Sequence, residues 1–178
     1  HLSSQSAWNK TLWGTENQLE WECAISLPAI DNQKVWAGLK LTNDQLIATD
    51  ENQAYFKFQT DVTNSESFSD FTKLHFIVTI ANVTYISQLP ITVAANTIYK
   101  LRISFNVDKK ISIFVNGVQY NITTTTGATG GTSVTTGTKT SAAFSSVDLI
   151  PYIGIEAGDD FAESLHVFYQ KISRVLFE

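Results

Sequence analysis

Hydrophobic and polar side chains alternate along most of this chain. In the segment 19–27 every second residue is apolar, and the residues between are Glu, Ala or Ser. Alternation with a period of two is typical of a β-strand that turns one face toward a core. The same pattern predicts further strands at 35–41, 46–48, 54–58, 73–80, 82–86, 97–105, 110–115, 118–122, 147–156 and 165–177. No helical period runs long enough to predict a helix, so we expect an all-β chain.

The strongest local signal is Asn116-Gly117, which separates the alternating runs 110–115 and 118–122. A two-residue type I′ turn requires positive φ at both central positions, which Asn and Gly tolerate. Its twist also matches that of the strands on either side. The sequence therefore predicts a tight hairpin with a fixed register.

The number of strands and the length of the chain indicate how the strands assemble. About a dozen short strands in 178 residues suit two antiparallel sheets packed face to face, in a single domain over 1–178. A jelly roll is favoured over an immunoglobulin sandwich, because the chain is longer than a seven-strand domain. Its single cysteine, Cys23, also cannot form the disulfide of antibody domains.

The segment 123–141 differs in composition from the rest of the chain. It consists mainly of Thr, Gly, Ser and Ala, with hardly a bulky side chain. Such a segment cannot bury enough apolar area to offset the entropy lost on ordering. We expect a long flexible loop, which is either functional or a tolerated insertion.

Charge and hydropathy exclude two classes of partner. The chain has 17 acidic and 12 basic residues, with no cluster of Lys or Arg, so we expect no binding to nucleic acid. No run approaches the roughly twenty apolar residues that cross a bilayer, so we expect no membrane insertion.

Several segments occur in an order that is found in a known superfamily. They are Leu19-Glu-Trp-Glu22, Trp36-Ala-Gly-Leu-Lys-Leu-Thr42, Ala54-Tyr-Phe-Lys-Phe58, Tyr99-Lys-Leu-Arg-Ile-Ser-Phe105, Ile113-Phe-Val-Asn-Gly-Val118 and Leu149-Ile-Pro-Tyr-Ile-Gly-Ile155. Over roughly 19–177 they resemble the concanavalin A-like lectin/glucanase (laminin-G-like) jelly rolls. Pro151-Tyr-Ile-Gly154 and the strand after it look like the version in structural proteins of tailed bacteriophages, notably marine ones. This resemblance implies an architecture more than a function, since lectins, glycosidases, adhesion modules and virion components share it.

A glycosidase would need two carboxylates that face each other across a cleft. Glu20 and Glu22 are the candidate pair, since residues two apart share one face of a strand. The resembling hydrolases carry Glu-x-Asp-x-x-Glu on such a strand, whereas this chain has Glu22 in the middle and Ile25 in the last place. The sequence also has no Gly-x-Ser-x-Gly motif. We therefore predict no catalytic residues and no enzymatic activity.

No cofactor is implied by the sequence, except that calcium remains open. Hard cations bind clusters of oxygen ligands in loops, and the resembling proteins often hold calcium at a sheet edge. The candidate ligands are Asp44, Asp50, Asp159 and Asp160. The alternative is that these residues shape turns through bonds to their own backbone.

Glycan binding usually requires an exposed aromatic ring on which a sugar can stack. Alternation places Trp21 in the core. The remaining candidates for a sugar platform are Trp8, Trp13, Trp36, Tyr85 and Tyr120. The alternative for each of them is ordinary packing.

Together these features predict a non-enzymatic surface module of a bacteriophage virion, serving as a decoration, fibre or adhesion domain. Its partners would be other virion proteins or a host cell-surface glycan. It would be located on the virion surface or in the extracellular space, and it could form a homo-oligomer. The alternative function is a lectin-like carbohydrate-binding module, with or without calcium.

Overall fold

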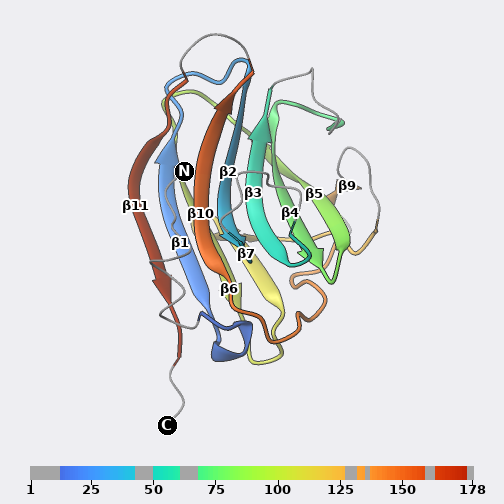
Figure 1. Ribbon diagram of the computed structural model, residues 1–178. Coiled ribbons are helices and arrows are strands. Elements are labelled where there is room, and N and C mark those ends of the chain that lie inside the picture. Colours follow the sequence, from blue (N-terminus) through green and yellow to red (C-terminus); the bar gives the residue numbers. More distant parts are fainter. Residues whose placement is uncertain are drawn as a thin grey trace.

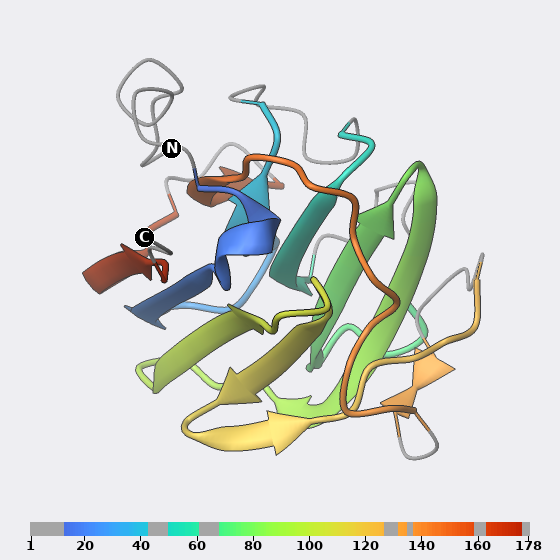
Figure 2. The same ribbon diagram turned by 90° about the horizontal axis from the view of Figure 1, so that it is seen from below.

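The computed structural model describes residues 13–42, 50–60, 68–126, 132–134, 137–158 and 163–175. Two β-sheets pack face to face, and Figures 1 and 2 show them as two layers. The all-β sandwich predicted from the alternation is confirmed. A short 3-10 helix, η1 (Thr15–Asn17), precedes the first strand. Among the described residues no helix is long and apolar enough to span a membrane.

The first sheet has five antiparallel strands in the order β11-β1-β6-β7-β8. Their bounds are β11 (His166–Ser173), β1 (Glu20–Ser26), β6 (Ile98–Phe105), β7 (Ile111–Val115) and β8 (Val118–Tyr120). The strands from the two ends of the chain thus lie side by side, as Figure 1 shows for β1 and β11.

The second sheet has six strands in the order β10-β2-β3-β4-β5-β9. Their bounds are β10 (Ile150–Ala157), β2 (Gln33–Lys40), β3 (Gln53–Gln59), β4 (Lys73–Ile80), β5 (Val83–Thr92) and β9 (Thr132–Ser133). All neighbours are antiparallel except β5 and β9. The strand predicted at 46–48 lies outside the described residues.

The core lies between the inner faces of the two sheets. In β1 the predicted inward set, which includes Trp21 and Cys23, is buried, and burial raises the pKa of the Cys23 thiol far above its usual range. The strands β2 and β3 differ from β1 because every one of their residues is buried. Both faces of the central part of the six-stranded sheet are therefore covered.

The predicted hairpin joins β7 to β8. Asn116 and Gly117 have φ of 51° and 82°, as a type I′ turn requires. The Asn116 side-chain oxygen accepts a hydrogen bond of 2.8 Å from the backbone N–H of Lys100, which fixes the turn to β6. The hairpin prediction is confirmed.

The segment predicted as a flexible loop, 123–141, contains some regular pairing. Thr132–Ser133 forms β9 beside Ser87 and Gln88 of β5, and Thr138 forms an isolated bridge with Ile122. These contacts use the backbone, which any residue type can supply, so composition gives no sign of them. Residues 127–131 and 135–136 lie outside the described part.

Candidate functional site

The outer face of the six-stranded sheet carries an unusual set of buried polar and aromatic side chains. The strand registers place these residues side by side, pointing away from the core. We call this set the polar sheet face; it comprises Lys34, Trp36 and Lys40 of β2, Gln53, Tyr55, Lys57 and Gln59 of β3, His75, Ile77 and Thr79 of β4, Ile86 and Gln88 of β5, and Tyr152 and Glu156 of β10.

His75 lies near the middle of this face and is fully buried. Its Nδ1 lies 3.0 Å from the carbonyl oxygen of Lys73 and donates to it, because a carbonyl can only accept. The proton is thus assigned to Nδ1. Nε2 carries a lone pair that no donor reaches in hydrogen-bonding geometry, although the neighbouring Gln88 side chain acts on the ring to raise its pKa. Burial lowers the pKa of His75 to about 4, so the imidazole is neutral at neutral pH.

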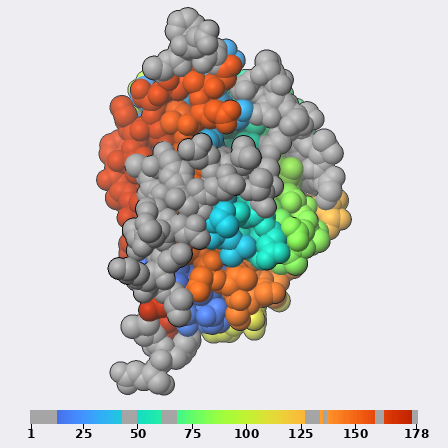
Figure 3. Space-filling model, viewed as in Figure 1, coloured from blue at the N-terminus to red at the C-terminus, as the bar shows by residue number. Residues whose placement is uncertain are grey.

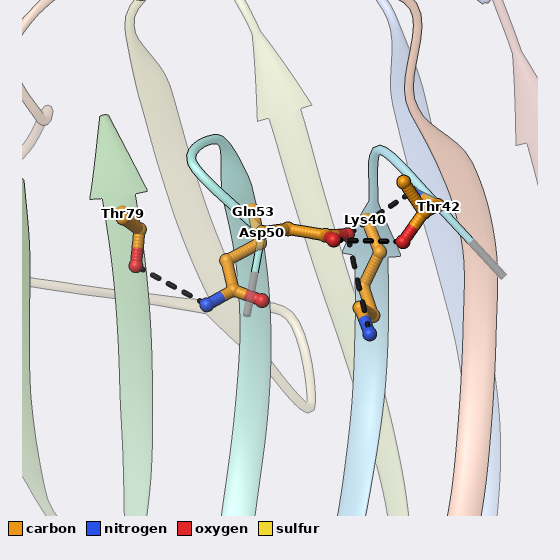
Figure 4. A network of polar contacts seen from close by, with 5 residues as sticks. All are labelled: Lys40, Thr42, Asp50, Gln53 and Thr79. Atoms are coloured by element: carbon orange, nitrogen blue, oxygen red, sulfur yellow. Dashed lines mark hydrogen bonds and ion pairs between the residues drawn. The ribbon is translucent and has the colours of Figure 1, made fainter. Parts of the chain in front are cut away.

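Other side chains of the polar sheet face also have a buried polar atom without a hydrogen-bond partner. Among them are the indole Nε1 of Trp36, a donor, and Oε1 of Gln53, an acceptor. The amide nitrogen of Gln53 donates to Oγ1 of Thr79 at 3.3 Å, as Figure 4 shows, and Thr79 in turn contacts Oγ1 of Thr84 at 3.0 Å. Buried atoms of this kind are normally satisfied, so their concentration on one face requires an explanation.

A buried ion pair lies at one end of the face. Nζ of Lys40 is 3.9 Å from Oδ2 of Asp50, and both side chains are almost fully buried (Figure 4). Asp50 also accepts hydrogen bonds from Thr42, at 3.0 Å from its backbone N–H and at 2.7 Å from its hydroxyl. Lys40 lies over the ring of Tyr152, 4.7 Å from its centroid. The structure thus places Asp50, a predicted calcium ligand, in an ion pair with Lys40 and in hydrogen bonds with Thr42.

The other predicted calcium ligands, Asp44, Asp159 and Asp160, lie outside the described residues. Within the described ranges no group of three or more His, Cys, Asp or Glu side chains is arranged to hold a metal ion. Calcium binding therefore stays a prediction.

Aromatic rings make up much of the rest of the face. Trp36 and Tyr152 stack with centroids 5.9 Å apart and planes 14° apart. Gly154, next to Trp36 across the strands, leaves space for the indole, since a Cβ there would lie 2.6 Å from its ring atoms. Trp36 and Tyr152 belong to a second hydrophobic cluster with Tyr55, Phe68 and Ile77. This cluster is separate from the main core.

Three lysines of the polar sheet face are buried. Lys34, Lys40 and Lys57 are opposed by Glu156, 2.8 Å from Lys34, and by Asp50 at the end of the face. The described part of the face thus combines buried lysines with carboxylates, and Lys57 lies at its centre with Nζ 5.4 Å from the ring centroid of Phe68.

Of the four described residues that were predicted as sugar platforms, only Trp36 lies on this face, and it is 7% exposed. Tyr85, Tyr120 and Trp13 are partly buried and pack against the main core. Trp8 lies outside the described residues. No role was predicted from the sequence for His75, Gln53 or Lys57, although residues 53–59 alternate between polar and apolar side chains.

Glu20 and Glu22 lie on the opposite side of the molecule, on the outer face of the five-stranded sheet. Glu20 pairs with Arg102 at 3.7 Å, and Glu22 accepts a hydrogen bond from the hydroxyl of Tyr169. This hydrogen bond, to an anionic acceptor, raises the pKa of Tyr169 to about 12. The two carboxylates share one face of β1, as predicted, and are engaged by these partners.

Comparisons with known proteins identify the fold. No protein-family model matches the chain. A search of curated proteins also finds no match. A solved polysaccharide lyase of family 18, aly-SJ02, has a TM-score of 0.54 at 12% identity, covering 93% of this chain and 75% of its own. An alginate lyase from Alteromonas sp. 272 has a TM-score of 0.52 at 12% identity, with the same coverage. The galectin LEC-6 of Caenorhabditis elegans has a TM-score of 0.48 at 18% identity, covering 92% of this chain and 87% of its own.

These likenesses correct one prediction. The chain was predicted not to be an enzyme because it lacks a hydrolase pair of carboxylates. The inference from that lack is wrong, because polysaccharide lyases, which are enzymes, are among the solved structures with this fold. The chain has the all-β, two-sheet sandwich fold of these lyases.

Proposed function

We propose that the polar sheet face binds an acidic polysaccharide. The observation that carries the proposal is the set of three buried polar atoms without hydrogen-bond partners, on Trp36, Gln53 and His75. They lie on three adjacent strands, one a donor and two acceptors. A sugar hydroxyl both donates and accepts, so a polyhydroxylated ligand can satisfy all three atoms.

The spacing of these atoms favours a chain of sugars over a single small molecule. Neighbouring strands lie about 4.8 Å apart, and Gln53 is four residues along β3 from Lys57, which stands between Trp36 and His75 in the register. At about 3.3 Å per residue the three groups extend over more than 10 Å in one direction. An oligosaccharide covers such a distance.

The lysines of the face favour a ligand with carboxylates. Lys57 is the direct cross-strand neighbour of both Trp36 and His75, and its side chain is 3% exposed. A cation at the centre of the face attracts an anion strongly because the surroundings exclude water. The lyases with this fold include alginate lyases, which makes alginate the first polysaccharide to test.

The test is equilibrium binding of alginate oligosaccharides, with a neutral β-glucan of similar length as the comparison. The proposal requires saturable binding of the acidic sugar that weakens in Lys57→Gln and persists in Lys100→Gln, which changes an exposed lysine of the other sheet. Equal binding of both sugars, or none, contradicts it. Repeating the titration with a chelator tests the prediction of calcium dependence.

Cleavage of the bound polysaccharide by elimination is a second candidate function, favoured by the state of His75. A neutral imidazole whose Nε2 lone pair has no partner is suited to accept a proton. In such a step Nε2 takes the proton from the carbon next to the uronate carboxylate. A double bond then forms as the glycosidic C–O bond breaks, and the imidazolium returns the proton to the leaving oxygen. Lys57 would stabilise the charge that develops on the carboxylate.

Ultraviolet absorbance of the unsaturated uronate product tests this step. Activity must appear in the wild type and disappear in His75→Gln, while His166→Gln, at an exposed position of β11, retains it. Binding without any unsaturated product restricts the face to a lectin-like role.

A role on a bacteriophage virion stays a prediction from resemblance, with virion proteins or host glycans as the partners. The extracellular location and the formation of a homo-oligomer also stay predictions. Proteomic analysis of purified particles and a host-cell pull-down test it. An acidic surface polysaccharide of a host cell would reconcile this prediction with the ligand proposed above.

A further inference from the structure

Phe68 covers the central residue of the polar sheet face. Its ring stacks on the imidazole of His75 with centroids 3.9 Å apart and planes 11° apart. Phe68 belongs to the connection before β4, so the ring is laid onto the face from outside the sheet. It is 4% exposed and packs with Trp36, Tyr55 and Tyr152.

Phe68 contributes no hydrogen bond to the polar atoms beneath it. A phenyl ring has neither a donor nor a conventional acceptor, so Nε2 of His75 remains without a partner while the ring lies there. A buried polar atom left in this state costs about 1–3 kcal/mol. A sugar ring in the same place would keep the flat apolar contact and add the missing hydrogen bond.

The described residues after Phe68 are held at the surface by polar contacts. Oγ of Ser69 donates to Oε1 of Gln88 at 2.7 Å, in an exposed position. Asp70 then forms a local turn by accepting from the backbone N–H of Thr72 at 2.9 Å and from its hydroxyl at 2.6 Å. These hydrogen bonds are open to water, which can replace them. Lifting the Phe68 ring therefore costs mainly the contacts of the ring itself, which are its packing in the aromatic cluster and the Nζ of Lys57 at 5.4 Å from its centroid.

From these contacts we propose that Phe68 occupies the place of a sugar ring over His75, so that polysaccharide binding has to displace it. Phe68 is thus an autoinhibitory contact of the polar sheet face. The inference rests on the proposed function, because it assumes that a sugar binds there. If Phe68 covers His75 in about nine of ten molecules, the apparent affinity for the polysaccharide is lowered about tenfold.

The state of His75 provides a readout that needs no ligand. The groups that face His75 are Lys57 of β3, Gln88 of β5, Lys73 of β4, and Asp70 of the connection before β4. Burial outweighs the other influences in lowering its pKa. Removing the Phe68 ring admits water, so the pKa of His75 rises from about 4 toward 6.5, the value of a free histidine.

The experiment compares the wild type with Phe68→Ala, Phe68→Leu and Phe168→Ala. Phe68→Leu keeps an apolar cover without a flat ring, so it provides a folded variant if the alanine variant does not fold. Phe168 is 57% exposed on β11 and serves as the matched control. Nuclear magnetic resonance titration gives the pKa of His75, and calorimetry gives the dissociation constant for alginate oligosaccharides.

We expect Phe68→Ala to raise the pKa of His75 and to bind the oligosaccharide about tenfold more tightly than the wild type. Phe68→Leu should give values between those of Phe68→Ala and the wild type. Phe168→Ala should change neither value. If the wild type binds and Phe68→Ala binds no more tightly, the inference is overturned and the proposed function stands. An unchanged pKa of His75 in Phe68→Ala also overturns it. If neither protein binds any acidic polysaccharide, the proposed function fails and the inference fails with it.

Discussion

Lys57 and His75 are direct cross-strand neighbours on β3 and β4, and both side chains are almost completely buried. The pair combines a cation with an imidazole that burial keeps neutral, and the charge of Lys57 further lowers the pKa of His75. A carboxylate that enters beside them would pair with Lys57 and raise the pKa of His75. Ligand binding and proton uptake at this face should therefore be coupled.

The buried neutral state of His75 makes stability depend on pH. The unfolded chain binds a proton at His75 below about pH 6.5, whereas the folded protein does so only near pH 4. Protonation therefore favours unfolding, and the free energy of unfolding should fall by up to about 3 kcal/mol as the pH drops through this range. Denaturant titrations between pH 7 and pH 4 measure the effect.

Two variants separate His75 from other acid-sensitive groups. His75→Gln should flatten the pH dependence between pH 6.5 and pH 4, while His166→Gln, at an exposed site, should leave it unchanged. A wild-type curve that is flat in this range would show that His75 is not held neutral by burial.

Breaking the ion pair of Lys40 and Asp50 should destabilise the fold mainly because it leaves a buried charge without its counter-ion. Asp50→Asn leaves the ammonium of Lys40 buried without its 3.9 Å carboxylate partner. The expected loss is about 3 kcal/mol in the free energy of unfolding. Glu156→Gln is the matched control, because the Glu156 side chain of the Lys34 pair is 56% exposed, and it should cost less than about 1 kcal/mol. Equal losses in the two variants would contradict the assigned burial.

The close contact between Gly154 and the indole of Trp36 predicts that even a methyl group disturbs the polar sheet face. A Cβ on Gly154 would lie 2.6 Å from ring atoms of Trp36, so Gly154→Ala should cost about 1–3 kcal/mol and alter the tryptophan fluorescence. In Gly117→Ala the new methyl group meets open space, and the cost comes from φ of +82°, about 1 kcal/mol. Its fluorescence should not change.

Alternation along the strands was sufficient to predict the sandwich, because side chains such as Trp21 and Leu19 have to reach one core. It was not sufficient for the site. The strands β2 and β3 are buried on both faces, so Trp36 and Lys57 are as covered as Phe56, and no period in the sequence distinguishes a second covered face from a solvated one. The role of Phe68 depends on a tertiary contact with His75 across a connection, which local patterns do not encode.

The most direct measurement of the central claim is a chemical-shift map of the protein titrated with alginate oligosaccharides and, separately, with a neutral β-glucan. The account predicts that the acidic sugar shifts the indole N–H of Trp36, the imidazole of His75 and the side chain of Gln53, while Glu22 and Arg102 on the other sheet stay unchanged. Shifts confined to the five-stranded sheet, or no saturable shift with any acidic polysaccharide, would contradict it.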